Sequence, residues 1–159
     1  MTAPIAASLA ARAEIVQAVA TFCERIDEYD WQGAADVFTE DCVVDYGAGR
    51  GGEVRGRVAC AERFRRGQSE FRKTHHQLGQ SRITVDADLQ HGAATTYITA
   101  WHEDWDGEGS VVRLRYLDTF ALVGECWQTA SRHVHAAGIE GFEGVEWNWV
   151  PRALPERRA

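Results

Sequence analysis

The apolar positions of the chain follow a helical period in its first third and a period of two after that. From Ser8 onward, apolar residues recur at the spacing of one helix face. They are Ile15, Val19, Phe22, Cys23 and Ile26. This amphipathic stripe predicts a long helix, with Asp27 at its end. Two shorter helices are predicted over 31–38, with Asp30 as the N-cap, and over 56–68.

Strands are predicted where the period changes to two. Residues 42–47 form a short predicted strand, and a turn-rich loop, GAGRGG, follows it. Four longer segments alternate and are separated by the turn signals DADLQHG, DGEG and GE. They are 74–86, 92–105, 110–123 and 126–137. Helices followed by a run of antiparallel strands indicate an α+β fold, with the helices packed on one curved sheet. We expect a single domain over 8–138 and a tail over 139–159.

Composition narrows the classes of partner. The 159 residues carry a formal net charge of −7, with 45% hydrophobic residues. An acidic chain lacks the basic face that nucleic acid requires, and the basic residues of 63–73 are interpreted as the solvated side of a helix and its exit. No stretch approaches the ~20 apolar residues of a membrane span, so no membrane partner is expected. The four cysteines form no C-x-x-C pair, and the N-terminus lacks a signal peptide pattern, which predicts free thiols and a cytoplasmic location.

Five chemically active side chains follow one another at the ends of these elements. They are Asp27 in RIDEYDW, Tyr46 in VVDYG, His76 in THHQLG, His102 in TAWHEDW and Trp127 in ECWQTASRH. This order and spacing resemble the SnoaL-like branch of the NTF2-like superfamily, most closely the scytalone dehydratase-like proteins, over about 11–138. The resemblance implies a cone in which a strongly curved antiparallel sheet and N-terminal helices enclose an apolar pocket. It implies no cofactor and no metal.

The resemblance also implies roles for individual residues. The catalytic aspartate of the family falls on Asp27 and its catalytic histidine on His76. The tyrosine that polarises a carbonyl group through water falls on Tyr46, and the second pocket histidine on His102. The family pattern is not kept throughout. A second tyrosine is replaced by Ile26, and a serine and an asparagine of the fourth strand by Leu114 and Tyr116, so we expect the reaction type to persist with a different substrate.

The residue types favour proton transfer. An imidazole exchanges protons near neutral pH, and a carboxylate on its other nitrogen fixes the tautomer. No serine or cysteine of the motif set stands beside Asp27 and His76 to serve as a nucleophile. The leading hypothesis is therefore a cofactor-independent lyase of the dehydratase type, acting on a small hydrophobic carbonyl or phenolic metabolite. The alternatives are a SnoaL-like cyclase or isomerase of natural-product biosynthesis, including epoxide-opening ring closure, and a non-catalytic NTF2-like binding module.

Alternation along the strands assigns further residues to the pocket. Tyr116 and Leu114 share an inward face with Asp118, which needs a buried partner, either His102 or His133. His133 is also predicted to line the pocket, whereas His75 faces away from it. A metal site built from His133, His135 and Glu140 is the weaker alternative, because the glycines that frame such a motif in cupins are missing.

Two aromatic groups lie outside the predicted pocket. Tyr97, Thr99 and Trp101 share the outward face of their strand, which is unusual for a monomer and predicts a homodimer or homotrimer packed through the sheet. Trp147 and Trp149 give the tail enough apolar area to fold back over the pocket or an interface.

Overall fold

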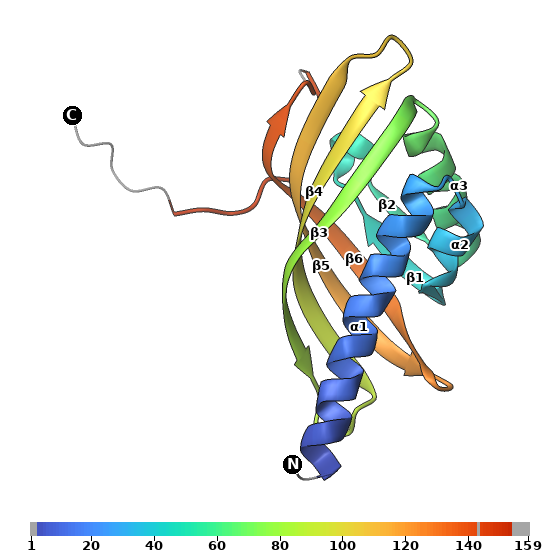
Figure 1. Ribbon diagram of the computed structural model, residues 1–159, viewed down its shortest axis with the longest axis vertical. Coiled ribbons are helices and arrows are strands. Elements are labelled where there is room, and N and C mark those ends of the chain that lie inside the picture. The colour runs from blue at the N-terminus through green and yellow to red at the C-terminus, as the bar shows by residue number, and fades with distance from the viewer. Residues whose placement is uncertain (1–2, 143, 154–159) are drawn as a thin grey trace, which may run out of the picture.

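A computed structural model of the protein describes residues 3–142 and 144–153. The helices of this part are α1 (Ala3–Asp27), α2 (Trp31–Asp36), the 3-10 helix η1 (Ala48–Arg50) and α3 (Arg57–Gln68). The strands are β1 (Phe38–Asp45), β2 (Glu53–Arg55), β3 (Phe71–Val85), β4 (His91–Asp104), β5 (Gly109–Val123) and β6 (Cys126–Glu140). Helices α1, α2 and α3 lie on the same side of one long, curved sheet (Figure 1). The predicted α+β class is confirmed.

Helix α1 packs its apolar stripe on the sheet. Ile15, Val19 and Phe22 are almost completely buried, as the helical period predicts. The helix begins at Ala3, five residues before the predicted start. By length and composition alone, Ile5–Asp27 could cross a membrane, with a mean hydropathy of 1.3. The expectation that no stretch is long and apolar enough for a membrane span is therefore wrong. A single helix of this kind is weak evidence of a membrane span, because core helices pass the same test.

The short helix α2 starts where the cap residue predicts. The Asp30 carboxylate accepts a hydrogen bond from the Gly33 amide at 2.8 Å, which satisfies one amide left free at the helix N-terminus. Helix α2 ends at Asp36, and β1 already begins at Phe38, four residues before the predicted strand. Phe38 is fully buried, so the sheet gains a core residue from a segment that the pattern assigned to a helix.

The six strands are arranged in the order β2-β1-β6-β5-β4-β3. All neighbours are antiparallel except β1 and β6, which run parallel. The β3–β6 meander ends with β6 beside β1, the first strand of the chain, and the two run in the same direction. The inward faces of β4, β5 and β6, together with α1, enclose the core.

Two of the register shifts in the sheet bear on which side chains approach that core. In β6 the register shifts so that Ala130 has no direct partner between Thr129 and Ser131. A one-residue shift exchanges the two faces of a strand, so Arg132 points inward and His133 points outward. In β3 the register shifts around Gly79, where a Cβ atom would lie 2.9 Å from the Tyr97 carbonyl oxygen. Only glycine allows that close approach of two strands.

The segment after β6 returns to the sheet. Trp149 forms a parallel bridge with Ala136, so 148–150 continues the edge of β6 beyond the end of β1. Phe142 and Trp147 are buried by this path, whereas Trp149 is half exposed. Residues 154–159 of the predicted tail lie outside the described residues.

The outward face of the sheet carries the aromatic residues expected there. Tyr97 and Trp101 are partly buried, and the Arg115 guanidinium lies 4.7 Å from the centre of the Tyr97 ring. Self-association through this face stays a prediction. Among the described residues the cysteines are free, with Cys23, Cys42 and Cys60 buried and Cys126 exposed.

Candidate active site

The end of α1 meets the start of β3 in a tight acid–base contact. Asp27 Oδ1 lies 2.7 Å from His76 Nδ1, and Oδ2 accepts the His76 backbone amide at 2.7 Å. The Thr74 hydroxyl donates to Oδ1 at 2.8 Å. Burial alone would raise the pKa of the Asp27 carboxyl, but the bonds from His76 and Thr74 outweigh it and lower that pKa. Asp27 is therefore a carboxylate at neutral pH.

This contact fixes the tautomer of His76. A carboxylate can only accept hydrogen bonds, so Nδ1 carries the proton of the neutral ring and Nε2 carries the lone pair. The His76 side chain is 5% exposed and lines an internal cavity. His75 is 71% exposed, with its Nδ1 3.9 Å from Asp27 Oδ2. The structure therefore places His76 inside and His75 outside.

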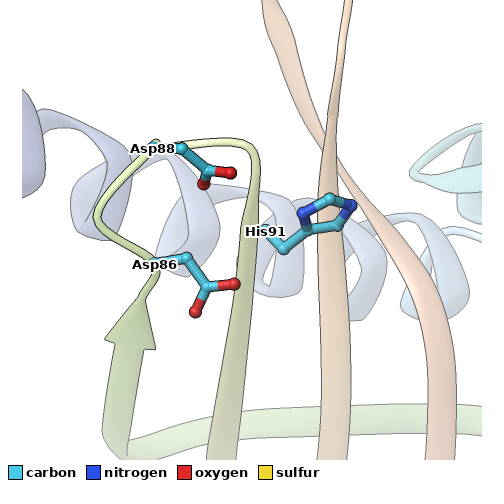
Figure 2. A group of neighbouring side chains, drawn as sticks. All are labelled: Asp86, Asp88 and His91. Atoms are coloured by element: carbon cyan, nitrogen blue, oxygen red, sulfur yellow. The ribbon is translucent and has the colours of Figure 1, made fainter.

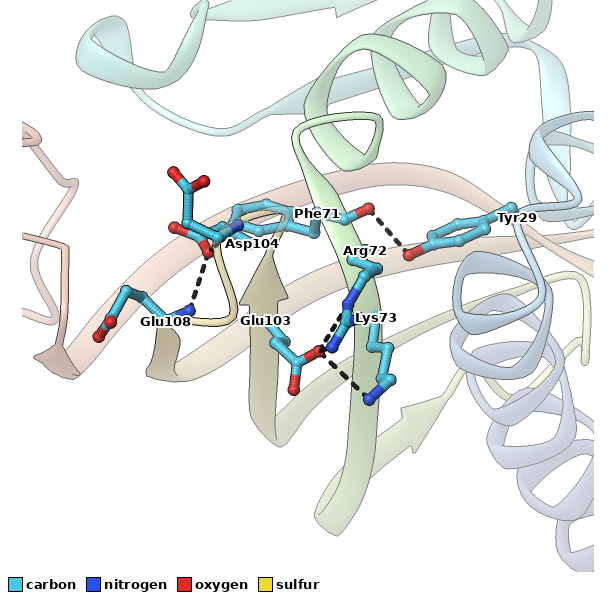
Figure 3. A network of polar contacts seen from close by, with 8 residues as sticks. Tyr29, Phe71, Arg72, Lys73, Glu103, Asp104 and Glu108 are labelled. Carbon is cyan, nitrogen blue, oxygen red and sulfur yellow. Dashed lines mark hydrogen bonds and ion pairs between the residues drawn. The ribbon is translucent and has the colours of Figure 1, made fainter.

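A polar clamp holds the two elements of the site together. The Tyr29 hydroxyl, just after α1, donates to the Phe71 carbonyl oxygen at the start of β3 at 3.0 Å (Figure 3). Arg72 and Lys73 both contact Glu103 of β4, with Lys73 Nζ 3.2 Å from Glu103 Oε1. At the same end of the sheet as the Asp27–His76 pair, the Tyr29 bond joins the end of α1 to β3, and the Glu103 contacts join β3 to β4.

The cavity beside His76 has a volume of about 40 Å³, enough for a few water molecules. Its wall combines apolar residues with a small set of polar ones. The lining residues are Phe22, Ile26, Tyr46, Arg50, Gln68, His76, Ala100, His102, Val112, Leu114, Tyr116, Val134, Phe142 and Trp147. The structure thus brings together seven of the predicted residues. Asp27 does not line the cavity but contacts His76, which does. The predicted residues that line the cavity are Ile26, Tyr46, His76, His102, Leu114 and Tyr116.

His102 is the second imidazole of the wall. Its ring centre lies 5.5 Å from that of His76 and 4.4 Å from that of Phe71. Burial, then His76 and Arg50, lower the pKa of His102 to about 3. The ring is therefore neutral at pH 7. Among the described residues its buried Nδ1 has no hydrogen-bond partner.

Two tyrosines add hydroxyl groups to the wall. Tyr46 lies one residue beyond β1, and Tyr116 lies on the inward face of β5. Burial raises the pKa of both phenols, so both are neutral donors at physiological pH. Within the described part of the chain neither hydroxyl has a hydrogen-bond partner, which leaves both able to bond to a molecule in the cavity.

The predicted partners of Asp118 are wrong. Asp118 accepts two hydrogen bonds from Arg132, at 2.9 Å from Nε and 2.7 Å from Nη2, and both side chains are completely buried. The bulge at Ala130 turns Arg132 inward and so supplies this partner. Burial lowers the pKa of Arg132, but Asp118 outweighs it and raises that pKa. Asp118 is not part of the cavity wall. It supports the wall through Arg132, which lies 4.0 Å from the Tyr116 ring centre.

The prediction that His133 lines the pocket is also wrong. The same bulge turns it outward, where the side chain is 49% exposed and its Nδ1 lies 3.8 Å from Asp45 Oδ2. His133 and His135 consequently lie on the opposite face of the sheet from His102, and Glu140 pairs with Arg113 at 2.7 Å. Among the described residues, His133, His135 and Glu140 do not bring their ligand atoms within 4.8 Å of one another.

Among the described residues, one other group has metal-ligand spacing. Asp86, Asp88 and His91 lie at the turn between β3 and β4 with ligand atoms within 4.8 Å of one another (Figure 2). All three side chains are exposed, and Asp88 already accepts the Gln90 amide at 3.0 Å. Exposed acidic groups of this kind are common without an ion. The turn lies at the end of β3 opposite Phe71, and therefore away from the Asp27–His76 pair.

Eight lining residues stand outside the site predicted from the sequence, and four of them come from loops or element ends. Arg50 and Gln68 come from the glycine-rich loop and the end of α3, and Phe142 and Trp147 from the segment after β6. Arg50 lies in a segment without periodicity, so no pattern assigns its direction. The aromatic residues of the tail indicated that it folds back on the protein, but the position of Trp147 depends on the bridge between Trp149 and Ala136.

Comparisons with known proteins agree with this architecture. Residues 7–133 match the family model of the SnoaL-like domain. No curated protein sequence matches the chain significantly. Among solved structures, a candidate scytalone dehydratase from Novosphingobium aromaticivorans superposes with a TM-score of 0.85 at 20% identity, covering 94% of this chain and 99% of that chain.

Two further structures share the fold at lower similarity. LinA gives a TM-score of 0.78 at 14% identity, covering 94% of this chain and 99% of that chain. ActVI-ORFA from Streptomyces coelicolor gives 0.67 at 17% identity, covering 79% and 96%. Identities in this range show a common NTF2-like fold and leave the reaction of this chain to be argued from its own residues.

Proposed function

Because the chain belongs to the SnoaL-like domain family, we propose that it is a cofactor-independent acid–base lyase of the dehydratase type. Its substrate in this proposal is a small, largely hydrophobic carbonyl or phenolic metabolite. The observation that carries the proposal is the 2.7 Å contact of Asp27 Oδ1 with His76 Nδ1 at the wall of a cavity. The fold shared with the candidate scytalone dehydratase and with LinA, a hexachlorocyclohexane dehydrochlorinase, supports it.

The proposed reaction uses one imidazole twice. His76 Nε2 removes a proton from the carbon next to the substrate carbonyl group, and the electron pair moves into an enolate. Asp27 stabilises the imidazolium that forms. The imidazolium then returns the proton to a leaving hydroxyl group, which departs as water while the enolate collapses to a carbon–carbon double bond. General acid–base catalysis of this kind contributes ~10²–10⁴-fold.

The neutral donors of the wall suit the charge that develops. Tyr46 and Tyr116 carry hydroxyl groups without a partner among the described residues, and their raised pKa values keep them protonated. A hydroxyl that donates to the enolate oxygen stabilises it more than it stabilises the starting ketone. Cyclisation and isomerisation need the same proton transfers as dehydration. The three reactions differ in whether the enolate expels water, closes a ring or is protonated at another carbon.

A non-catalytic binding or assembly module is the second candidate. The volume of about 40 Å³ favours it, because small-molecule sites usually occupy ~300–1,000 Å³. The wall itself argues the other way. Gln68 Oε1, His102 Nδ1 and Trp147 Nε1 are buried without a partner among the described residues. Each such group costs ~1–3 kcal/mol, a cost that an interior serving only as a packed core does not need.

The test is proton exchange in heavy water. The wild-type protein is incubated in D₂O with small β-hydroxy ketones and phenolic ketones, and products are followed by NMR and mass spectrometry. We expect deuterium at the carbon next to the carbonyl and, for the lyase, loss of one water. A product that gains only the exchanged deuterium and loses no water would assign an isomerase or cyclase.

Two matched histidine variants complete this test. His76→Gln should abolish the exchange, whereas His75→Gln, one position away and exposed, should keep it. Equal exchange in both variants would remove His76 from the mechanism. If the wild-type protein neither catalysed exchange with any of the compounds nor bound any of them, the proposal of a binding or assembly module would take the place of the lyase proposal.

A further inference from the structure

Arg50 stands between the internal cavity and the surface. Its guanidinium lies 4.8 Å from the Trp147 ring centre and 5.8 Å from that of Phe142. The same residue lines the cavity beside His76 and two depressions on the outside. Arg50 is therefore common to the wall of the cavity and to both depressions.

The guanidinium of Arg50 has no internal counterion at contact distance. Among the described residues, no carboxylate lies within 4.0 Å of it and no hydrogen bond leaves its side chain. Glu70 lines both outer depressions and attracts Arg50 without forming an ion pair. A half-buried guanidinium carries five donors and stays charged, so it is costly to leave without an anion.

Of the two outer depressions the first is basic although the chain is acidic, whereas the second is lined by Glu70, Asp104 and Glu108 beside Arg50. The first depression has a volume of about 330 Å³ and is lined by Arg50, Arg63 and Arg66 against a single acidic residue, Glu70. The whole chain carries a net charge of −7. A local positive field in the first depression raises the local concentration of anions there and excludes cations.

The neighbouring cations are already engaged, which limits the anion to a small one. Arg63 Nη2 donates to the Arg50 carbonyl oxygen at 2.6 Å, and its guanidinium lies 4.6 Å from the Tyr46 ring centre. Arg66 faces Glu62 at 3.7 Å. One free guanidinium fork matches the two oxygens of one carboxylate, whereas a phosphate dianion would need a second cation.

We propose that the substrate carries a carboxylate, which Arg50 binds at the mouth of the cavity while the reacting carbon lies at His76. This inference rests on the proposed lyase function and narrows its substrate class to carbonyl or phenolic acids. Binding displaces the Arg50 guanidinium from Trp147 and Phe142 and enlarges a cavity of about 40 Å³. The Trp147 indole N–H, buried without a partner among the described residues, is then placed to donate to the same anion.

The test uses two probes of one shape and different charge. Salicylate and salicylamide are titrated calorimetrically into the full chain at low salt. The wild-type protein should bind salicylate at least about 10-fold more tightly than salicylamide, the effect expected of a charge-assisted hydrogen bond. Arg50→Gln should remove that preference. Arg55→Gln, which makes the same change of charge at a 70% exposed side chain away from the cavity, should keep it.

Two further variants separate this inference from the reaction. His76→Gln should keep the preference for salicylate, so loss of proton exchange does not count against the anion site. Arg50→Lys, which keeps the charge without the fork, should reduce the preference and serves if Arg50→Gln fails to fold. Equal affinities for both probes, an unchanged preference in the folded Arg50 variant, or no binding up to millimolar concentrations would each overturn the proposal.

Discussion

The protein buries two acid–base pairs of similar geometry and different chemistry. Asp27 and His76 join α1 to β3 at 2.7 Å, and Asp118 and Arg132 join the neighbouring strands β5 and β6 at 2.9 and 2.7 Å. The first pair borders a cavity, with Asp27 21% exposed. The second pair is completely buried.

The cation decides what each pair can do. An imidazole loses and regains a proton near neutral pH, so a carboxylate on one ring nitrogen prepares the other nitrogen for proton transfer. A guanidinium keeps its proton, so Asp118 and Arg132 only hold two strands in register and support the Tyr116 ring. Burial of an ion pair is therefore no mark of catalysis unless one partner titrates and faces a space that a substrate can reach.

The largest effect is expected from breaking the structural pair. Asp118→Asn leaves the buried Arg132 guanidinium without a counter-charge, which should lower the free energy of unfolding by about 3–5 kcal/mol in urea titrations. Glu140→Gln is the matched control, because it breaks an exposed pair with Arg113 at the same 2.7 Å. The control should lose less than about 1 kcal/mol. Similar losses in both variants would contradict the structural role assigned to Asp118.

Breaking the Asp27–His76 pair should cost activity before it costs stability. In Asp27→Asn the amide can donate to Nδ1 and move the imidazole proton to Nε2, which removes the base. We expect the rate of deuterium exchange to fall at least about 100-fold. Glu28→Gln, at the next position and 55% exposed, should leave the rate unchanged. A rate that survives in Asp27→Asn would reduce this pair to a second structural contact.

The neutral state of His102 gives the site a measurable pH dependence. Its pKa is about 3 in the folded protein and 6.5 in an unfolded chain, so between these values only the unfolded state gains the proton. Stability from this group is unchanged above pH 6.5 and falls as the pH drops below it, by about 2 kcal/mol at pH 5. Urea unfolding at pH 7 and pH 5 should show this loss in the wild-type protein.

Two variants isolate that loss. His102→Gln should remove about 2 kcal/mol of the difference between the two pH values. His91→Gln, which changes an exposed histidine of the same strand, should leave the difference as it is. If both variants kept the full pH dependence, His102 would not be the neutral buried group that the structure describes.

The contrast between the two pairs also separates what the sequence predicts from what it cannot. Asp27 and His76 lie at the ends of strongly periodic segments, and the resemblance to SnoaL-like proteins matches their order, so both were predicted. Arg132 was missed and His133 was misplaced because strict alternation ignores the bulge at Ala130. Nothing in the local sequence marks a bulge that depends on pairing with β5.

Residues of irregular segments were hidden for a different reason. Arg50 lies within the glycine-rich loop 47–52, so no period assigns its side chain a direction. Phe142 and Trp147 reach the cavity because 148–150 pairs with β6, a long-range contact formed only in the folded sheet. The fold class needs only periodicity, whereas the mouth of the site depends on the path of two loops.

The smallest effect should come from the hydroxyl that supports the catalytic pair. Thr74→Val removes one of three hydrogen bonds to Asp27 and should lower the free energy of unfolding at pH 7 by about 1 kcal/mol. Thr74 also helps to lower the pKa of the Asp27 carboxyl group. A carboxyl group whose pKa is lower in the folded than in the unfolded protein stabilises the fold, and this contribution is lost as the pH falls through the pKa of the folded state. The variant should therefore unfold at a higher pH in an acid titration followed by circular dichroism. Thr84→Val, on the same strand with a weak 3.4 Å contact, should not shift that midpoint. An equal shift of the acid-unfolding midpoint in both variants would mean that the threonines act through their strand propensity. The lowered pKa of Asp27 would then be due to His76 alone.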